Sequence, residues 1–190
     1  MTFAKPLLSA VLYVALSLGA IPVHAGTPSP AELREMRAGE MRKLAVHKQP
    51  ADMPRVEIED MQGNARTLDE FKGRYVVLNF WATWCAPCRA EMPSLAALQE
   101  QMGSDRFQVL LVAVGHNPKP AITRFFKEIK VTNLTTLRDP GQRLSGQAAV
   151  FGLPTTVILD PDGKEIARMV GDANWSSPEA LSLIKGLLGG

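Results

Sequence analysis

The 190-residue sequence predicts one α/β domain, with a central, mainly parallel sheet and helices on both of its faces. Two continuous apolar and β-branched runs, at 75–81 and 107–114, are typical of strands buried on both faces. A run with helical spacing, at 87–102, lies between them. Near the end, two predicted strands at 155–159 and 165–170 flank Pro161-Asp162-Gly163 and predict an antiparallel hairpin.

The other elements are weaker signals around this frame. Residues 28–48 carry apolar side chains at helical spacing and predict an amphipathic helix, followed by a linker with two prolines at 49–54. We therefore divide the chain into residues 1–25, an N-terminal helix and linker at 26–54, and the α/β domain at 55–190. Within that domain we expect strands at 56–58 and 134–137, a turn at 62–64, and helical segments at 67–71, 120–129, 142–150 and 178–188.

The first 25 residues have the pattern of an export signal. Lys5 precedes an apolar run at 7–23, and Val23-His24-Ala25 fits the small-x-small cleavage site, so that Gly26 would begin the mature chain. The alternative is an uncleaved membrane anchor, although 17 residues span only about 25 Å as a helix, less than a hydrocarbon core of about 30 Å. Both interpretations place the domain outside the cytoplasm, and we expect a periplasmic location.

The charge balance excludes a class of partners. The chain has 21 basic and 19 acidic residues, a formal net charge of +2, with no basic cluster. We therefore expect no binding to nucleic acid and no polybasic attachment to a membrane surface. A monomer is expected.

The two cysteines carry the chemical signal. Cys85 and Cys88 are only three positions apart, and a disulfide across so short a loop removes little entropy from the unfolded chain. Half of a zinc site is the other alternative, but a second Cys-x-x-Cys pair is lacking and the histidines after the signal are His47 and His116. We therefore expect no metal and no cofactor, and interpret the pair as redox-active.

The predicted position of the pair supports this chemistry. Cys85 follows the 75–81 strand and would begin the next helix, where free backbone N–H groups and the helix dipole favour a thiolate, the nucleophilic form. Cys88 lies one turn later and could resolve a mixed disulfide by attacking Cys85. Pro87 restricts the loop and has no N–H to leave unsatisfied.

The segment 77–93, VLNFWATWCAPCRAEMP, resembles the active-site segment of exported thioredoxin-fold oxidoreductases of the TlpA/ResA group, and TlpA most closely. Pro93 matches the helix-kinking proline of that family, and Gly152-Leu153-Pro154-Thr155 resembles the loop that carries its cis-proline. The stretch 115–137 corresponds to the helix-and-strand insert of the group. The resemblance implies a thioredoxin fold over roughly residues 56–188, with this central insert and an N-terminal extension.

The resemblance also implies roles for individual residues. Glu91, three residues after Cys88, matches a glutamate that handles protons near the cysteines, and Asn79 stands where cytosolic thioredoxins carry a buried aspartate. Because asparagine cannot take a proton, this departure shifts acid–base work to Glu91. Partner binding is expected at Trp84, Pro87 and the backbone of Leu153 and Pro154, whereas Trp81 could be a site wall or core.

The expected function is that of a periplasmic disulfide reductase. The resemblance implies a membrane electron donor of the DsbD/CcdA type, and as clients apocytochromes c or copper-site proteins of cytochrome oxidase assembly. Two alternatives stay open: a DsbA-like oxidant, because the same pair can run in the other direction, and a Sco-like copper metallochaperone. The Cys-x-x-Cys spacing and the lack of a histidine after His116 argue against the second.

Overall fold

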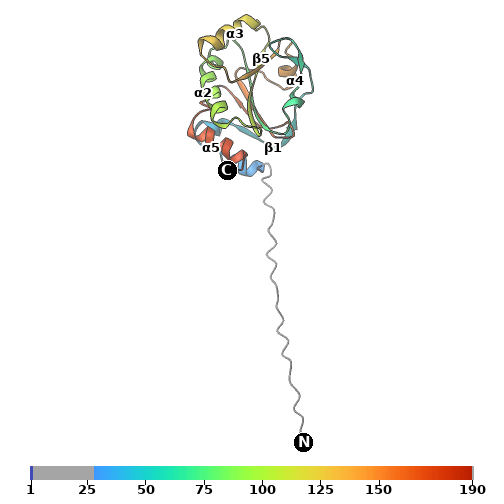
Figure 1. Cartoon of the computed structure of the whole chain (residues 1–190), viewed down its shortest axis with the longest axis vertical. Coiled ribbons are helices and arrows are strands. Elements are labelled where there is room, and N and C mark those ends of the chain that lie inside the picture. Colours follow the sequence, from blue (N-terminus) through green and yellow to red (C-terminus); the bar gives the residue numbers. More distant parts are fainter. Residues whose placement is uncertain (2–27, 190) are drawn as a thin grey trace.

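The computed structural model describes Met1 and residues 28–189. Its strands form one mixed sheet in the order β1-β8-β7-β4-β5-β6-β2-β3, with helices on both faces (Figure 1). The α/β architecture expected from the sequence is therefore confirmed, but the expectation of a mainly parallel sheet is wrong, because β4–β5 and β5–β6 are parallel while the other strand pairs of the described residues are antiparallel. The expected export signal at residues 1–25 lies, apart from Met1, outside the described residues, and it stays a prediction. Among the residues that are described, no helix is long and apolar enough to cross a membrane.

The centre of the sheet is built from the apolar runs. β4 (Tyr75–Trp81) pairs in parallel with β5 (Phe107–Val114), which pairs in parallel with β6 (Thr135–Asp139). On its other side β4 pairs antiparallel with β7 (Thr155–Leu159), and β7 with β8 (Lys164–Val170). All residues of β4 are buried, as a central strand covered on both faces requires.

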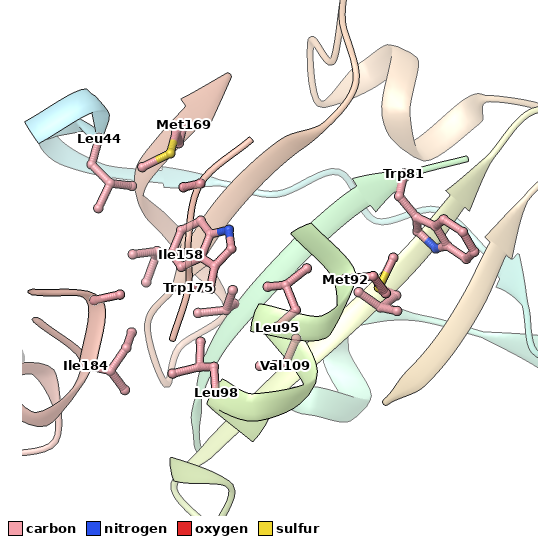
Figure 2. Packing of buried hydrophobic residues seen from close by; sticks show 14 of the residues in the cluster. Leu44, Trp81, Met92, Leu95, Leu98, Val109, Ile158, Met169, Trp175 and Ile184 are labelled. Atoms are coloured by element: carbon pink, nitrogen blue, oxygen red, sulfur yellow. The ribbon is translucent and has the colours of Figure 1, made fainter. Parts of the chain in front are cut away.

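The side chains of β4 alternate between two apolar clusters. Val77 and Trp81 belong to the cluster under α2 (Ala86–Met102), α3 (Lys119–Glu128) and α5 (Pro178–Leu187), which Figure 2 shows in part. Val76 and Phe80 belong to the cluster under the 3₁₀ helix η2 (Leu68–Phe71) and α4 (Arg143–Gln147). This alternation is the two-residue period of a strand, and it gives the sheet a helix layer on each face.

The segment before residue 54 differs from the prediction. Instead of one helix over 28–48 the structure has a short α1 (Pro30–Glu35), a 3₁₀ helix η1 (Gly39–Lys43) and a strand β1 (Ala45–Asp52) that pairs antiparallel with β8. Gly39 has a φ of +51°, a left-handed conformation that an α-helix does not contain. Pro50 lies in β1, where it is tolerated because β1 is an edge strand.

This N-terminal segment nevertheless packs on the sheet. Leu33, Met41 and Leu44, which suggested the helix, are almost fully buried in the cluster under α2 and α5. The predicted linker at 49–54 is largely strand, so that prediction is wrong too. The domain boundary at residue 54 stays a prediction, while the structure adds that residues on both sides of it share one sheet.

The far edge of the sheet holds two short strands, β2 (Ile58–Glu59) and β3 (Ala65–Arg66). They are joined by the expected turn, in which one carboxylate oxygen of Asp60 accepts the backbone N–H groups of Gln62, Gly63 and Asn64 at 2.8–2.9 Å. β2 also pairs antiparallel with β6. This edge completes the sheet, and the cysteines lie where β4 runs into α2.

Candidate active site

Cys85 and Cys88 form a disulfide at the start of α2, with a sulfur–sulfur distance of 2.03 Å. Cys85 is the N-cap residue of the helix, and its sulfur accepts the backbone N–H of Cys88 at 3.3 Å. Cys85 is therefore placed where free N–H groups stabilise a thiolate, as the sequence predicts.

The two sulfurs differ in their surroundings. Both cysteines belong to the apolar cluster under α2, with Cys85 5% and Cys88 0% exposed, but Cys85 also lines a hollow of about 570 Å³ at the surface. The hollow lies between the start of α2, the loop after β5 and the loop before β7; its lining residues are Trp84, Cys85, Pro87, Val114, Gly115, His116, Gln142, Val150, Phe151, Gly152 and Leu153. Of the two cysteines, only Cys85 borders it.

Two exposed aromatic rings stand at this hollow. Trp84 is 67% exposed and Phe151 94%, values that are unusual for large apolar side chains. Leu153 lines the hollow as well, and the Leu153–Pro154 peptide bond is cis, as expected from the resemblance. Pro154 itself is buried, and Pro87 is exposed at the rim. The structure thus brings Trp84, Pro87 and Leu153 together around Cys85.

Phe151 and His116 were not predicted for this hollow. His116 follows β5, and the carboxyl ends of the parallel strands β4 and β5 meet at one edge of the sheet, a signal that could have placed it beside the cysteines. Phe151 lies between α4 and β7, and nothing in its local sequence indicates that its ring is exposed.

On the other side, Glu91 is buried, with only 4% of its surface exposed. One of its oxygens accepts the Asn79 amide at 2.8 Å, and the other accepts the backbone N–H of Ala173 and the indole N–H of Trp175, both at 3.3 Å. Burial raises the pKa of Glu91 to about 7, because desolvation outweighs these hydrogen bonds, which pull it down. Nearby Asp172 adds a smaller upward contribution to the pKa.

Asn79 connects the sheet to this carboxyl group. It lies in β4 opposite Thr156 of β7, and its amide donates to both Glu91 Oε1 and Thr156 Oγ1, at 2.8 and 2.9 Å. Its Oδ1 atom is buried and has no partner among the described residues. Asn79 therefore contacts the carboxyl group of Glu91, for which the resemblance implies a role in proton transfer. Glu91 and Cys88 lie one turn apart on the same helix.

Asn117 forms hydrogen bonds with Thr83, two residues before Cys85. Its Oδ1 accepts the backbone N–H and the hydroxyl of Thr83, at 2.7 and 2.9 Å, and its amide donates to the carbonyl of Val114 at 2.7 Å. Asn117 is almost fully buried, and its role was not predicted. Trp81 is completely buried with its ring 5.4 Å from those of Phe125 and Phe126, so it is core and not a wall of the site.

The two histidines among the described residues lie in different parts of the fold. His116 borders the Cys85 hollow, while His47 lies in β1 and contacts Glu165 at 2.7 Å. Within the described part of the chain, no group of three or more His, Cys, Asp or Glu side chains could hold a metal ion.

Comparison with known proteins gives consistent matches. The AhpC/TSA family model matches residues 50–167. The thiol-disulfide oxidoreductase ResA of Bacillus subtilis is 34% identical over 136 residues, which cover 71% of this chain and 75% of ResA. ResA of Geobacillus thermodenitrificans is 34% identical over 107 residues, or 56% of this chain and 60% of that protein.

Solved structures agree with this. A putative thiol:disulfide interchange protein DsbE from Chlorobium tepidum superposes with a TM-score of 0.65 at 25% identity, over 76% of this chain and all of that one. The exposed lipoprotein thioredoxin Etrx1 of Streptococcus pneumoniae superposes with a TM-score of 0.58 at 27% identity, over 71% of this chain and 98% of that one.

Proposed function

The chain belongs to the AhpC/TSA family, with the thioredoxin-like fold of the ResA and DsbE-type thiol-disulfide oxidoreductases, and from this premise we propose that it reduces disulfides in exported proteins. One observation carries the proposal: Cys85 borders a surface hollow, while Cys88 is buried one helical turn from a carboxyl group with a raised pKa. This asymmetry suits a dithiol in which one sulfur attacks and the other resolves.

The proposed reaction has two exchanges. The Cys85 thiolate attacks a client disulfide, forms a bond to one client sulfur and releases the other as a thiolate. Cys88 then loses its proton to Glu91 and attacks Cys85 Sγ, which re-forms the Cys85–Cys88 disulfide and expels the second client sulfur. The client gains two electrons and, with two protons taken up, becomes a dithiol, and the protein is left oxidised.

The direction of the proton transfer follows from the surroundings of Glu91. Its pKa near 7 is closer to that of a thiol than an ordinary carboxyl pKa is, so the ionised form is a stronger base for Cys88. Asn79 has no proton to exchange and instead donates to Glu91. We therefore assign the proton-accepting role to Glu91 and a positioning role to Asn79.

Client binding is assigned to the hollow beside Cys85. A cysteine-bearing segment of the client would lie along the backbone of Leu153 and Pro154, with the exposed rings of Trp84 and Phe151 and the rim at Pro87 against its apolar side chains. Desolvating two exposed aromatic rings favours association without requiring a particular client sequence.

The proposal includes a cellular compartment, an electron donor and a class of client proteins. The export signal expected at 1–25 supports a periplasmic location. A periplasmic reductant needs electrons from the membrane, which supports a donor of the DsbD/CcdA type, and the resemblance to TlpA and ResA supports apocytochromes c or copper-site proteins as clients.

The reduction potential of the Cys85–Cys88 pair tests the reducing direction. We expect a value at or below about −200 mV, and a value near −120 mV, typical of a strong oxidant, would assign the opposite direction. The measurement uses the chain from residue 26 equilibrated with glutathione buffers at pH 7, with the fraction oxidised read by alkylation of free thiols. The Cys85→Ser variant, which cannot form the disulfide, is the control.

A further inference from the structure

A second hollow lies beside Glu91, distinct in its lining from the one that Cys85 borders. It measures about 490 Å³ and is lined by Glu40, Ala90, Glu91, Pro93, Ser94, Asp172, Ala173, Asn174 and Ser176. Glu91 is one of these lining residues, although only 4% of its surface is exposed. The buried Glu91 therefore lies beside a surface hollow other than the one that Cys85 borders.

The loop of residues 172–176 contacts the Glu91 carboxyl group. It supplies two of the donors to Glu91 Oε2, the backbone N–H of Ala173 and the indole N–H of Trp175. Ser94 of α2 fastens the same loop, because its hydroxyl accepts the backbone N–H of Trp175 at 3.0 Å and donates to the carbonyl of Glu91 at 2.7 Å. Trp175 itself is buried between Ile158 and α2 (Figure 2).

Glu40 attaches the N-terminal segment to this loop. Its Oε2 accepts the backbone N–H of Asn174 at 3.0 Å, and its Oε1 pairs with Lys43 at 3.0 Å. Glu40 lies on η1, whose neighbours Met41 and Leu44 are fully buried and which packs against α5. Glu40 itself lies at the surface, but the buried Met41 and Leu44 fix the position of the backbone that carries its carboxylate.

The charged groups around Glu91 come from the loop of residues 172–176 and from η1. Asp172 of the loop raises its pKa, Glu40 of η1 lines the same hollow, and the facing strands β4 and β7 contribute only the neutral Asn79 and Thr156. The residues lining the hollow include no lysine or arginine. Two carboxylates therefore face this space with Lys43, paired to Glu40, as the nearby cation.

We propose that Glu40 is a positioning residue for Glu91: by holding Asn174 it keeps the 172–176 loop closed over the buried carboxyl group, so that the N-terminal segment sets the proton affinity of the site. The coupling to the cysteine pair rests on the proposed function, whereas the closed loop does not. The segment before residue 54 would then be part of the active-site support and not only a link to the signal.

Two variants separate the hydrogen bond from the charge. Glu40→Ala removes both the acceptor for Asn174 and the negative charge, while Glu40→Gln keeps an acceptor oxygen. In Glu40→Ala we expect the amides of Ala173 and Asn174 to exchange with solvent about tenfold faster, because a hydrogen bond to a charged group is lost. Water entering the opened loop relieves the desolvation of Glu91, so its titration midpoint falls from near 7 towards the ordinary carboxyl value.

The measurement is NMR on the oxidised protein. Hydrogen exchange reports the two loop amides, and the indole N–H signal of Trp175, which donates to Glu91, reports the ionisation of that carboxyl group between pH 4 and 9. Neither readout needs a client or an electron donor, so both remain valid if the protein proves to be an oxidant. We expect loop exchange in Glu40→Gln close to that of the wild type.

Glu32→Ala is the matched control, because Glu32 belongs to the same N-terminal segment and closes the capping box of α1 with Ser29. The positioning role is overturned if Glu32→Ala changes the loop as much as Glu40→Ala does, since general loosening of the segment then explains both. It is equally overturned if Glu40→Ala leaves loop exchange unchanged, or speeds it without moving the Trp175 titration. Unfolding curves of all variants establish that each one is folded.

Discussion

The two sides of the Cys85–Cys88 disulfide are built in opposite ways. On the Cys85 side, an open hollow carries exposed apolar rings, with Trp84 67% and Phe151 94% exposed. On the Cys88 side, a buried carboxyl group is surrounded by hydrogen-bond donors from β4 and the loop of residues 172–176. The first arrangement suits contact with another polypeptide, and the second suits the holding and release of a proton.

One short helix turn produces this difference. Cys85, the N-cap of α2, is 5% exposed and borders the open hollow, while Cys88 and Glu91 follow at a spacing of three residues and do not border it. Exchange chemistry needs both features, since the attacking sulfur must meet a client and the resolving sulfur must lose its proton without water competing for the mixed disulfide.

The largest effect is expected from replacing each cysteine by serine in turn. Cys88→Ser should retain attack by Cys85 and accumulate a stable mixed disulfide with a client, because the resolving sulfur is missing. Cys85→Ser should trap essentially none, since Cys88 is fully buried. Non-reducing gels of periplasmic extracts measure both, and equal trapping by the two variants would remove the assigned asymmetry.

The next effect concerns stability on the Cys88 side. Glu91 has a folded-state pKa of about 7 against an ordinary value of 4.5, so between these pH values the folded chain holds a proton that the unfolded chain has released. The free energy of unfolding should therefore fall as pH rises through this range, by about 2 kcal/mol from this group between pH 5 and pH 8. In Glu91→Gln that contribution should disappear.

Denaturant titrations of the oxidised protein at both pH values measure this difference. Glu100→Gln is the matched control, because Glu100 lies on the same helix and is exposed. If Glu91→Gln and the wild type lose the same stability between pH 5 and pH 8, the carboxyl group does not titrate as described.

The smallest effect is expected on the Cys85 side. Phe151→Ser should raise KM for a protein disulfide about tenfold, because the contact area lost on docking amounts to about 1–2 kcal/mol. Its kcat, reduction potential and unfolding midpoint should stay near the wild-type values, since the ring is 94% exposed and packs little in the free protein. Val170→Ser, at a residue 67% exposed that does not line the hollow, is the control. An unchanged KM in Phe151→Ser would remove this ring from the docking surface.

Much of the fold could be predicted because its signals are local. The strands β4 and β5 coincide with the apolar runs at 75–81 and 107–114, since a strand buried on both faces is mostly apolar, and β7 coincides with the first strand of the expected hairpin at 155–159. The N-terminal segment could not be predicted in the same way. Leu33, Met41 and Leu44 have helical spacing, yet each is buried by a different local structure, and the pairing of β1 with β8 joins residues more than a hundred positions apart.

The site residues also fall into those that could be predicted from the local sequence and those that could not. The order strand, Cys85-Ala86-Pro87-Cys88, helix was readable from the sequence, and Glu91 followed from its spacing and from the family resemblance. The sheet and its loops bring four further residues to the site from positions 29 to 87 residues away from Cys88: Phe151, Asn117, Trp175 and Glu40. The local sequences of Phe151, Trp175 and Glu40 do not indicate these contacts. Asn117 is the exception, because it follows β5, whose carboxyl end lies beside that of β4.

The central claim is that Glu91 takes the proton of Cys88 when the mixed disulfide is resolved. Stopped-flow reaction of the reduced protein with a chromogenic aryl disulfide separates attack by Cys85 from the release of the second thiolate. Measured from pH 5 to 9, release in the wild type should accelerate through about pH 7. In Glu91→Gln it should be about a hundredfold slower at pH 7.5 and lack that step. Equal release rates with the same inflection in both proteins would contradict the claim.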